Sequence, residues 1–348
     1  MTGAVETLNP GYFALVMATG ILSVAMDFKG LDIVSAILLA ITAGSWVLLV
    51  LLTGWRILRH WARFRADFTD PGRGFGFFTF TAATGVLGAR LAEQSWPLAA
   101  GLLAVAAASW FLLGYLVPWT AVLHSSSRST LSGANGTWFM WVVASQSVAV
   151  LAAILQPNDG LGRRELAMLA VFCWSVGAFL YAGVAVLVAA RLMLYPQRPA
   201  DLLPAYWVSM GATAITVLAG SQIVEMADTP MIEATRGLIA GCSVVFWAFG
   251  TWLIPILIAA GIWRHIIHKW PLRYDATLWS IIFPLGMYAA ASHYLGVADH
   301  LPIVRAIGDA EAWFAMLAWT AVFVAMIRHL WLTLVLGRGA EPAQSLAP

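Results

Sequence analysis

The sequence predicts an all-α integral membrane protein with ten transmembrane helices. The first observation is composition: 61% of the 348 residues are apolar and only 10% are charged, and the mean hydropathy is +0.82. Soluble domains have about 45–50% apolar and about 25% charged residues, so a lipid bilayer must be the main solvent of this chain. The other two observations are ten long apolar runs and a pattern repeated in alternate runs.

Each apolar run has about the length that crosses a bilayer as a helix. The runs cover residues 10–27, 33–55, 74–92, 96–123, 137–156, 167–194, 204–224, 236–262, 276–296 and 312–336. Turn-forming sequences such as Asp70-Pro71-Gly72 separate them. We therefore expect an N-terminal segment of residues 1–9, one membrane transport domain of residues 10–336 and a C-terminal tail of residues 337–348.

The charged residues between the runs are distributed unevenly. The side that holds both termini carries 13 Lys or Arg against 6 acids, and the opposite side carries 6 against 11. Lys and Arg remain preferentially in the cytoplasm. This asymmetry predicts a multi-pass protein of the cytoplasmic membrane with both termini inside the cell, and the net charge of +2 indicates no nucleic-acid partner.

In each odd-numbered run an aromatic residue stands seven residues before a small residue, two turns along one helical face. The aromatic residues are Tyr12, Phe77, Trp138, Tyr206 and Trp279, and the small residues are Thr19, Thr84, Ser145, Thr213 and Gly286. The pattern recurs every 61 to 73 residues, the length of two membrane helices with their loops. It favours five repeated helical hairpins. The alternative is an interfacial belt of aromatic residues at helix ends.

Small and polar residues recur on this face of the odd helices, and in mid-membrane such residues line either water or a close helix contact. If the five faces converge, they line a narrow central passage. The candidate lining residues are Thr19, Gly20, Thr84, Gly85, Ser145, Gln146, Thr213 and Gly286. The alternative is tight helix packing with hydroxyls bonded to their own helix.

Pro284 in the ninth run removes a backbone hydrogen bond, which predicts a helix kink. Phe283 precedes it, and in the repeat register only the ninth helix places a ring at this level. A bulky ring in a narrow passage closes it, so Phe283 is the candidate gate, with an ordinary packed Phe as the alternative. Phe80 and Trp141 are weaker candidates for a second constriction.

The odd runs contain no evident mid-membrane charge, and His293 is the most deeply placed titratable residue. It is a candidate for proton coupling, with interfacial hydrogen bonding as the alternative. The sequence has no metalloprotease, redox or nucleophile motif. We therefore expect no enzyme activity, no metal site and no cofactor.

Two segments resemble a known family. They are residues 9–23, Asn-Pro-Gly-Tyr-Phe-Ala-Leu-Val-Met-Ala-Thr-Gly-Ile-Leu-Ser, and residues 279–286, Trp-Ser-Ile-Ile-Phe-Pro-Leu-Gly. Both are similar to the tellurite-resistance/C4-dicarboxylate transporter family, which includes the bacterial tellurite-resistance membrane protein, the plant guard-cell slow anion channel and fungal malate and sulfite transporters. The resemblance extends over about residues 9–336.

This resemblance implies ten helices arranged as five hairpins with pseudo-fivefold symmetry around a central pore that the odd helices form. It also implies a homotrimer in which every protomer has its own pore, and an occluding Phe that matches Phe283. The expected function is a small-anion channel or transporter in the lipid bilayer. The alternatives are a proton-coupled carrier of C4-dicarboxylates or sulfite, and a structural membrane protein without transport.

Overall fold

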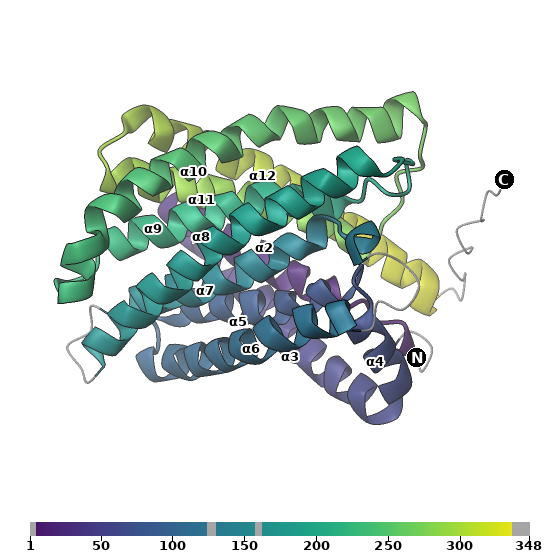
Figure 1. The fold of residues 1–348 in the computed structure, drawn as a ribbon, viewed down its shortest axis with the longest axis horizontal. Helices are drawn as coiled ribbons and strands as arrows, with labels where there is room; N and C mark the ends of the chain where they lie inside the picture. Colours follow the sequence, from purple (N-terminus) through teal and green to yellow (C-terminus); the bar gives the residue numbers. More distant parts are fainter. Residues whose placement is uncertain (1–4, 124–129, 157–161, 336–348) are drawn as a thin grey trace.

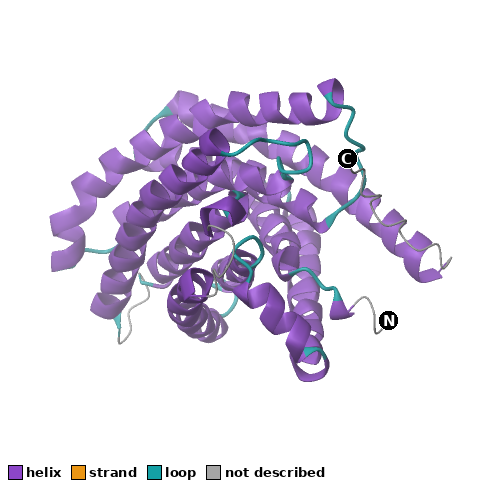
Figure 2. Ribbon diagram, turned by 45° about the vertical axis from the view of Figure 1, so that its right-hand side comes forward, coloured by secondary structure: helices purple, strands orange, loops and turns teal. Residues whose placement is uncertain are grey.

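The computed structural model describes residues 5–123, 130–156 and 162–335, which form helices and connecting loops without any strand (Figures 1 and 2). In these ranges nine helices are long and apolar enough to cross a membrane. They are Pro10–Phe28, Asp32–Arg59, Trp96–Ala121, Gly136–Leu155, Arg163–Leu194, Pro204–Val224, Pro230–Ile267, Ala276–Ala298 and Pro302–Thr333. The chain is thus a multi-pass helical membrane protein.

Five helices, here called the inner helices, form a closed ring. They are α2 (Ala14–Phe28), α5 (Phe78–Leu91), α7 (Met140–Leu155), α9 (Val208–Val224) and α11 (Trp279–Ala298). Each contacts the next one in this order, and α11 contacts α2. Every member of the ring therefore has two inner neighbours.

Five longer helices, the outer helices, surround this ring (Figure 1). They are α3 (Asp32–Arg59), α6 (Trp96–Leu123), α8 (Arg163–Leu194), α10 (Pro230–Ile262) and α12 (Pro302–Leu330), and each packs on the inner helix that precedes it in the chain. The apolar windows of the four long inner segments are 72 to 89% buried, against 17 to 39% for the outer helices. Apolar side chains on the outer helices consequently face lipid.

The predicted third span, residues 74–92, is not among the nine long apolar helices. Its α-helical part, α5, has only 14 residues, and most of them are buried between other helices. A helix that is shielded from lipid does not need the strongly apolar surface of a lipid-facing one. Its place in the ring therefore comes from packing and not from its own hydropathy.

Each inner helix begins with a short 3₁₀ turn, and these turns meet at one end of the ring, here called the near end. The turns are Pro10–Phe13, Gly74–Phe77, Gly136–Phe139, Pro204–Trp207 and Ala276–Leu278, and each touches the next around the ring. Three begin after an Asn or Asp whose side chain accepts a backbone N–H: Asn9, Asn135 and Asp275. Such caps satisfy donors that a helix start leaves free. The end where the inner helices finish is the far end.

Tryptophans on four outer helices donate indole hydrogen bonds to the inner helix of the following pair. The donors and acceptors are Trp46 to Thr84 Oγ1 (3.0 Å), Trp174 to the Thr216 carbonyl (3.0 Å), Trp247 to Ser292 Oγ (2.9 Å) and Trp319 to Thr19 Oγ1 (3.0 Å). Trp110 occupies the corresponding place on α6, but its buried Nε1 has no hydrogen-bond partner among the described residues. The five tryptophans thus repeat along the chain with the helix pairs.

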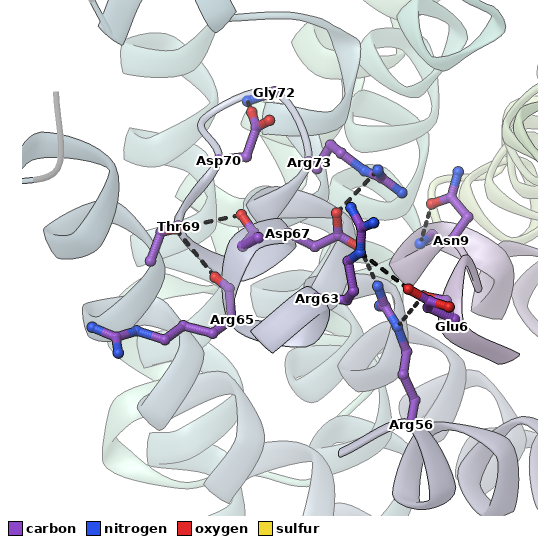
Figure 3. A network of polar contacts seen from close by, with 12 residues as sticks. Glu6, Asn9, Arg56, Arg63, Arg65, Asp67, Thr69, Asp70, Gly72 and Arg73 are labelled. Atoms are coloured by element: carbon purple, nitrogen blue, oxygen red, sulfur yellow. Dashed lines mark hydrogen bonds and ion pairs between the residues drawn. The ribbon is translucent and has the colours of Figure 1, made fainter. Parts of the chain in front are cut away.

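At the near end a nine-residue helix, α4 (Trp61–Thr69), follows α3 and was not predicted. Arg56 at the end of α3 pairs with Asp67 of α4 and donates from Nε to the Glu6 carbonyl at 3.2 Å. Asp67 also pairs with Arg73 at 3.0 Å, and Arg63 pairs with Glu6 at 3.2 Å (Figure 3). This network fastens α4 and the segment before the first helix to α3. The remaining short elements are Thr130–Gly133, Trp263–Ile267 and Trp331–Val335.

Candidate functional site

A cavity of about 240 Å³ lies inside the ring of inner helices. All five inner helices contribute to its wall, together with Glu93 in the turn after α5, and none of the described lining residues comes from an outer helix. The lining residues are Ile21, Val24, Asp27, Gly85, Val86, Ala89, Arg90, Glu93, Ser147, Val150, Ile154, Ile215, Leu218, Gln222, Met287 and Tyr294. The cavity therefore lies on the axis of the ring.

The wall of this cavity changes in character along the axis. Aliphatic side chains line its middle, whereas Asp27, Arg90, Glu93, Gln222 and Tyr294 line it toward the far end. These polar residues come from the last turns of α2, α5, α9 and α11 or from the turn after α5. The far mouth thus presents charged and hydrogen-bonding groups before an apolar interior.

Toward the near end, the cavity lining stops at a common level. Its first residues on the five helices are Ile21, Gly85, Ser147, Ile215 and Met287. Four or five residues earlier on the same helices stand Val16, Thr81, Val142, Met210 and Phe283, and all five are 0% exposed. Phe283 has the largest side chain of these five and stands one helical turn before Met287, the first lining residue of α11. Thr81 instead contacts an outer helix, since its Oγ1 lies 2.8 Å from Ser109 Oγ of α6.

Several predicted lining side chains contact outer helices. Thr19 and Thr84 accept the indole hydrogen bonds of Trp319 and Trp46. Ser145 Oγ donates to the Cys173 carbonyl at 2.9 Å, and Gln146 Nε2 donates to the Trp174 carbonyl at 3.1 Å. These bonds join the inner ring to its surrounding layer.

The remaining predicted lining positions divide between helix contacts and the cavity. Thr213 Oγ1 donates to the Met210 carbonyl and lies against Gly250 of α10. Gly20 lies against Val86, and Gly286 lies against Ile21, so both permit close approach of neighbouring helices. Gly85 is part of the cavity wall.

The cavity wall is displaced from the predicted face by two residues in four helices: Ile21, Val86, Ser147 and Ile215 line it, where Thr19, Thr84, Ser145 and Thr213 were predicted. Two residues correspond to about 200° of rotation around an α-helix. In these four helices, Thr19, Thr84, Ser145 and Thr213 therefore lie on the side of the helix away from the cavity wall.

The two candidates for a second constriction also contact the outside of the ring. Phe80 stacks on Trp46 of α3 at 6.4 Å between ring centroids. Trp141 stacks on Phe78 at 6.2 Å and lines a separate apolar groove along α8. Neither residue belongs to the wall of the axial cavity.

Pro284 and His293 both lie on α11. Pro284 is inside this helix and packs on Gly211 of α9, where an added Cβ would come within 2.8 Å of Pro284 Cγ. His293 Nδ1 is 2.9 Å from Asp309 Oδ1 of α12, and Phe28 stacks on the imidazole at 4.0 Å. Lys29 Nζ lies 3.4 Å from the same Asp309 oxygen. His293 thus belongs to a polar cluster that joins α11, α12 and the end of α2.

Arg90 was not among the candidate residues that the sequence indicated. Its side chain is only 10% exposed and reaches from α5 to α2 and α3. The guanidinium donates to Asp27 Oδ1 at 2.7 Å, Ser23 Oγ at 3.1 Å and Ser35 Oγ at 2.8 Å. One signal was available, because Arg90 is the only Lys or Arg within the five odd-numbered apolar runs.

At the near end, Tyr274 stands in the loop before α11. Its hydroxyl lies 3.0 Å from the Tyr12 hydroxyl and accepts a hydrogen bond from Trp279 Nε1 at 3.2 Å. Burial, supported by the interaction with Tyr12, raises the pKa of Tyr274 well above its ordinary value. This loop therefore contributes a neutral hydroxyl at neutral pH. The described residues include no group of three or more side chains that suit a metal ion.

A ring of membrane helices that encloses an axial cavity with a polar mouth defines a membrane protein of the channel or transporter class. Residues 7–327 match the family described as SLAC1, voltage-dependent anion channel, and the chain belongs to this family. The resemblance noted in the sequence is thereby confirmed.

Individual relatives agree with this assignment. An uncharacterized membrane protein of Mycobacterium tuberculosis is 61% identical over 168 residues, which cover 48% of this chain and 84% of the relative. An uncharacterized transporter of Methanocaldococcus jannaschii is 25% identical, with 92% of each chain covered. A sulfite efflux pump of Arthroderma benhamiae is 22% identical, with 92% of this chain and 90% of the pump covered.

Proposed function

We propose that this protein carries small anions across the cytoplasmic membrane along the axis of the inner ring, and that Phe283 occludes this path. The observation that carries the proposal is the axial cavity, which all five inner helices line and whose lining on α11 begins one turn after the fully buried Phe283. Membership of an anion-channel family and similarity to a sulfite efflux pump support an anion as substrate.

The proposal includes the complete architecture. Ten spans form five hairpins with pseudo-fivefold symmetry, and the helix contacts and repeated tryptophans support this arrangement. The excess of Lys and Arg supports cytoplasmic termini, with residues 10–336 as the transport domain and a cytoplasmic segment of residues 1–9. The proposed cytoplasmic tail, residues 337–348, lies outside the described residues. A homotrimer with one pore in each protomer completes the architecture, on the basis of the resemblance alone.

Selection within this path relies on size and local dipoles, because the middle of the cavity is aliphatic. An anion that crosses it loses hydration without gaining a fixed charge there, and the narrow path disfavours large anions. Small inorganic anions fit this path better than dicarboxylates.

The second candidate function is a proton-coupled carrier of C4-dicarboxylates or sulfite. The observation that favours it is the His293–Asp309 contact, which places a titratable group on the helix that also carries Phe283. A coupled carrier requires such a group to change charge during transport.

The deciding experiment measures anion flux into proteoliposomes containing wild type, Phe283→Ala or Phe78→Ala. Phe78 is a matched control because it is also 0% exposed, but its ring packs on Trp141 outside the cavity. We expect Phe283→Ala to raise chloride and sulfite flux at least tenfold and Phe78→Ala to leave it near wild type. If a well-folded Phe283→Ala protein shows the same flux as wild type, Phe283 does not occlude the path.

The same proteoliposomes distinguish the two candidate functions. A channel gives flux that follows the anion gradient, whether or not a pH gradient is present. A carrier gives saturable malate or sulfite uptake that a pH gradient drives and that His293→Gln uncouples. Absence of every one of these fluxes in all variants would exclude transport of these anions.

A further inference from the structure

Among the described residues, Arg90 is the one cationic side chain in the wall of the axial cavity, and it lies at the far mouth. We propose that Arg90 is an anion-binding residue at this mouth, and that the Asp27 carboxylate competes with the transported anion for its guanidinium. The role of this site in transport rests on the proposed function, whereas the binding site itself can be tested separately.

Three side chains hold the guanidinium in place. Ser23 accepts from Nε at 3.1 Å, and both Ser35 and Asp27 accept from Nη2, at 2.8 Å and 2.7 Å. The two serines also bond to each other's helices: Ser23 Oγ donates to the Ser35 carbonyl at 2.8 Å, and Ser35 Oγ donates to the Ser23 carbonyl at 2.7 Å. Arg90 therefore keeps its position even when its charged partner leaves.

Asp27 is the replaceable member of this cluster. Its side chain is 42% exposed, against 10% for Arg90, while Ser23 and Ser35 are both 0% exposed. Asp27 also lines the cavity, so an incoming anion meets the carboxylate and the guanidinium together. An anion that displaces Asp27 gains a charge-assisted hydrogen bond from a donor that is already oriented.

The geometry favours a small oxyanion. A guanidinium presents parallel N–H donors that match two oxygens of one anion, as it does with a carboxylate or phosphate. The Asp27 carboxylate is itself an oxyanion, and its contact with Arg90 shows that the guanidinium can donate to an anion of this kind. The tethered carboxylate also prevents tight retention, because it recaptures Arg90 when the anion leaves. The site thus binds the anion weakly enough for release, as conduction requires.

The chain offers a matched control for this proposal. Glu93 lines the same cavity and carries the same charge as Asp27. The hydrogen bonds described for Arg90 go to Ser23, Asp27 and Ser35, and not to Glu93. Neutralising either acid changes the charge of the mouth equally, but only Asp27→Asn removes the competitor.

The experiment combines a binding readout with a transport readout. Thermal stabilisation of the detergent-purified protein is titrated with sodium sulfite against sodium gluconate at equal ionic strength. The half-saturating sulfite concentration for flux is measured in proteoliposomes. We expect Asp27→Asn to lower the half-saturating sulfite concentration roughly tenfold, both for thermal stabilisation and for flux. One freed charge-assisted contact allows a change of this size. Glu93→Gln should change the same concentrations less than about twofold, and Arg90→Gln should abolish the stabilisation by sulfite.

Each outcome decides one of the two proposals. If Asp27→Asn and Glu93→Gln change the half-saturating sulfite concentrations equally, the net charge of the mouth explains the effect. This outcome would overturn the inference of a specific Arg90 site. Unchanged sulfite stabilisation in Arg90→Gln and Asp27→Asn would do the same, even if flux through Phe283→Ala persists. If no variant conducts but sulfite stabilises the protein only when Arg90 is present, the binding site stands and the proposed transport function fails. Because Asp27→Asn is a gain of affinity, a folding defect cannot imitate it.

Discussion

Two buried arginines at opposite ends of the molecule make the same kind of contact in different surroundings. Arg56 at the near end is 4% exposed and pairs with Asp67, which is 10% exposed (Figure 3). Arg90 at the far end is 10% exposed, but its partner Asp27 is 42% exposed and lines the cavity. In both pairs a guanidinium at the end of a helix meets a carboxylate on a neighbouring segment.

The difference between the two pairs lies in whether solvent reaches the carboxylate. Asp67 is enclosed, also binds Arg73, and fastens α4 to α3, so no solute can replace it without disrupting local packing. Solvent reaches Asp27, while Ser23 and Ser35 hold Arg90 from the buried side. An enclosed partner makes an arginine structural, and an exposed partner leaves it available for binding.

The largest expected effect tests the enclosed pair. Asp67→Asn leaves the buried Arg56 without a charged partner, and breaking such a pair costs about 3 kcal/mol or more. We expect a clear fall in the thermal unfolding midpoint of the protein in detergent. Asp228→Asn is the control, because Asp228 pairs with Arg236 but is 69% exposed. If both substitutions shift the midpoint equally, the burial of Asp67 does not make its ion pair more important for stability than an exposed one.

A smaller effect is expected for the exposed pair. Asp27→Asn should lower the free energy of unfolding by less than about 1 kcal/mol, because an exposed ion pair contributes little and the two serines retain the guanidinium. Its thermal midpoint in gluconate should stay close to that of wild type. If Asp27→Asn lowers the free energy of unfolding as much as Asp67→Asn does, the cluster at the far end is structural and the two arginines do not differ in role.

The sequence predicted the helical layout well because hydropathy reports directly on lipid contact. Nine of the ten predicted runs coincide with long apolar helices, and the short buried α5 is the exception. Three outer helices begin at least four residues earlier than predicted, at Arg163 instead of residue 167, at Pro230 instead of residue 236 and at Pro302 instead of residue 312. Their first turns carry charged residues such as Glu233 and Arg305, which an apolar window excludes but a helix end tolerates.

The sequence did not reveal which way the repeated face points. Hydroxyl and small residues suit both a water-filled passage and a tight helix contact, so Thr19 and Thr84 are compatible with either. The partners that decide this question, Trp319 and Trp46, stand on outer helices, and Trp319 is 300 residues away from Thr19 in the chain. Arg90 was overlooked for a related reason, because its burial depends on serines contributed by two other helices.

The smallest expected effect concerns two buried indole N–H groups, which are neutral hydrogen-bond donors. As with the two arginines, what each contributes depends on its partner. Trp319 donates to Thr19 at 3.0 Å, whereas the buried Nε1 of Trp110 has no hydrogen-bond partner among the described residues. Replacing either residue by Phe removes similar ring area, but only Trp319→Phe removes a hydrogen bond. Such bonds between membrane helices contribute about 0.6 kcal/mol, so Trp319→Phe should lower stability by that much more than Trp110→Phe.

Unfolding of both tryptophan variants in mixed detergent, titrated side by side, measures this difference. Trp110→Phe should be neutral or slightly stabilising, because it removes a donor whose desolvation nothing offsets. An equal loss in the two variants would mean that ring packing alone holds the outer helices to the ring. A larger loss for Trp110→Phe would contradict the expectation that its indole N–H contributes nothing to stability.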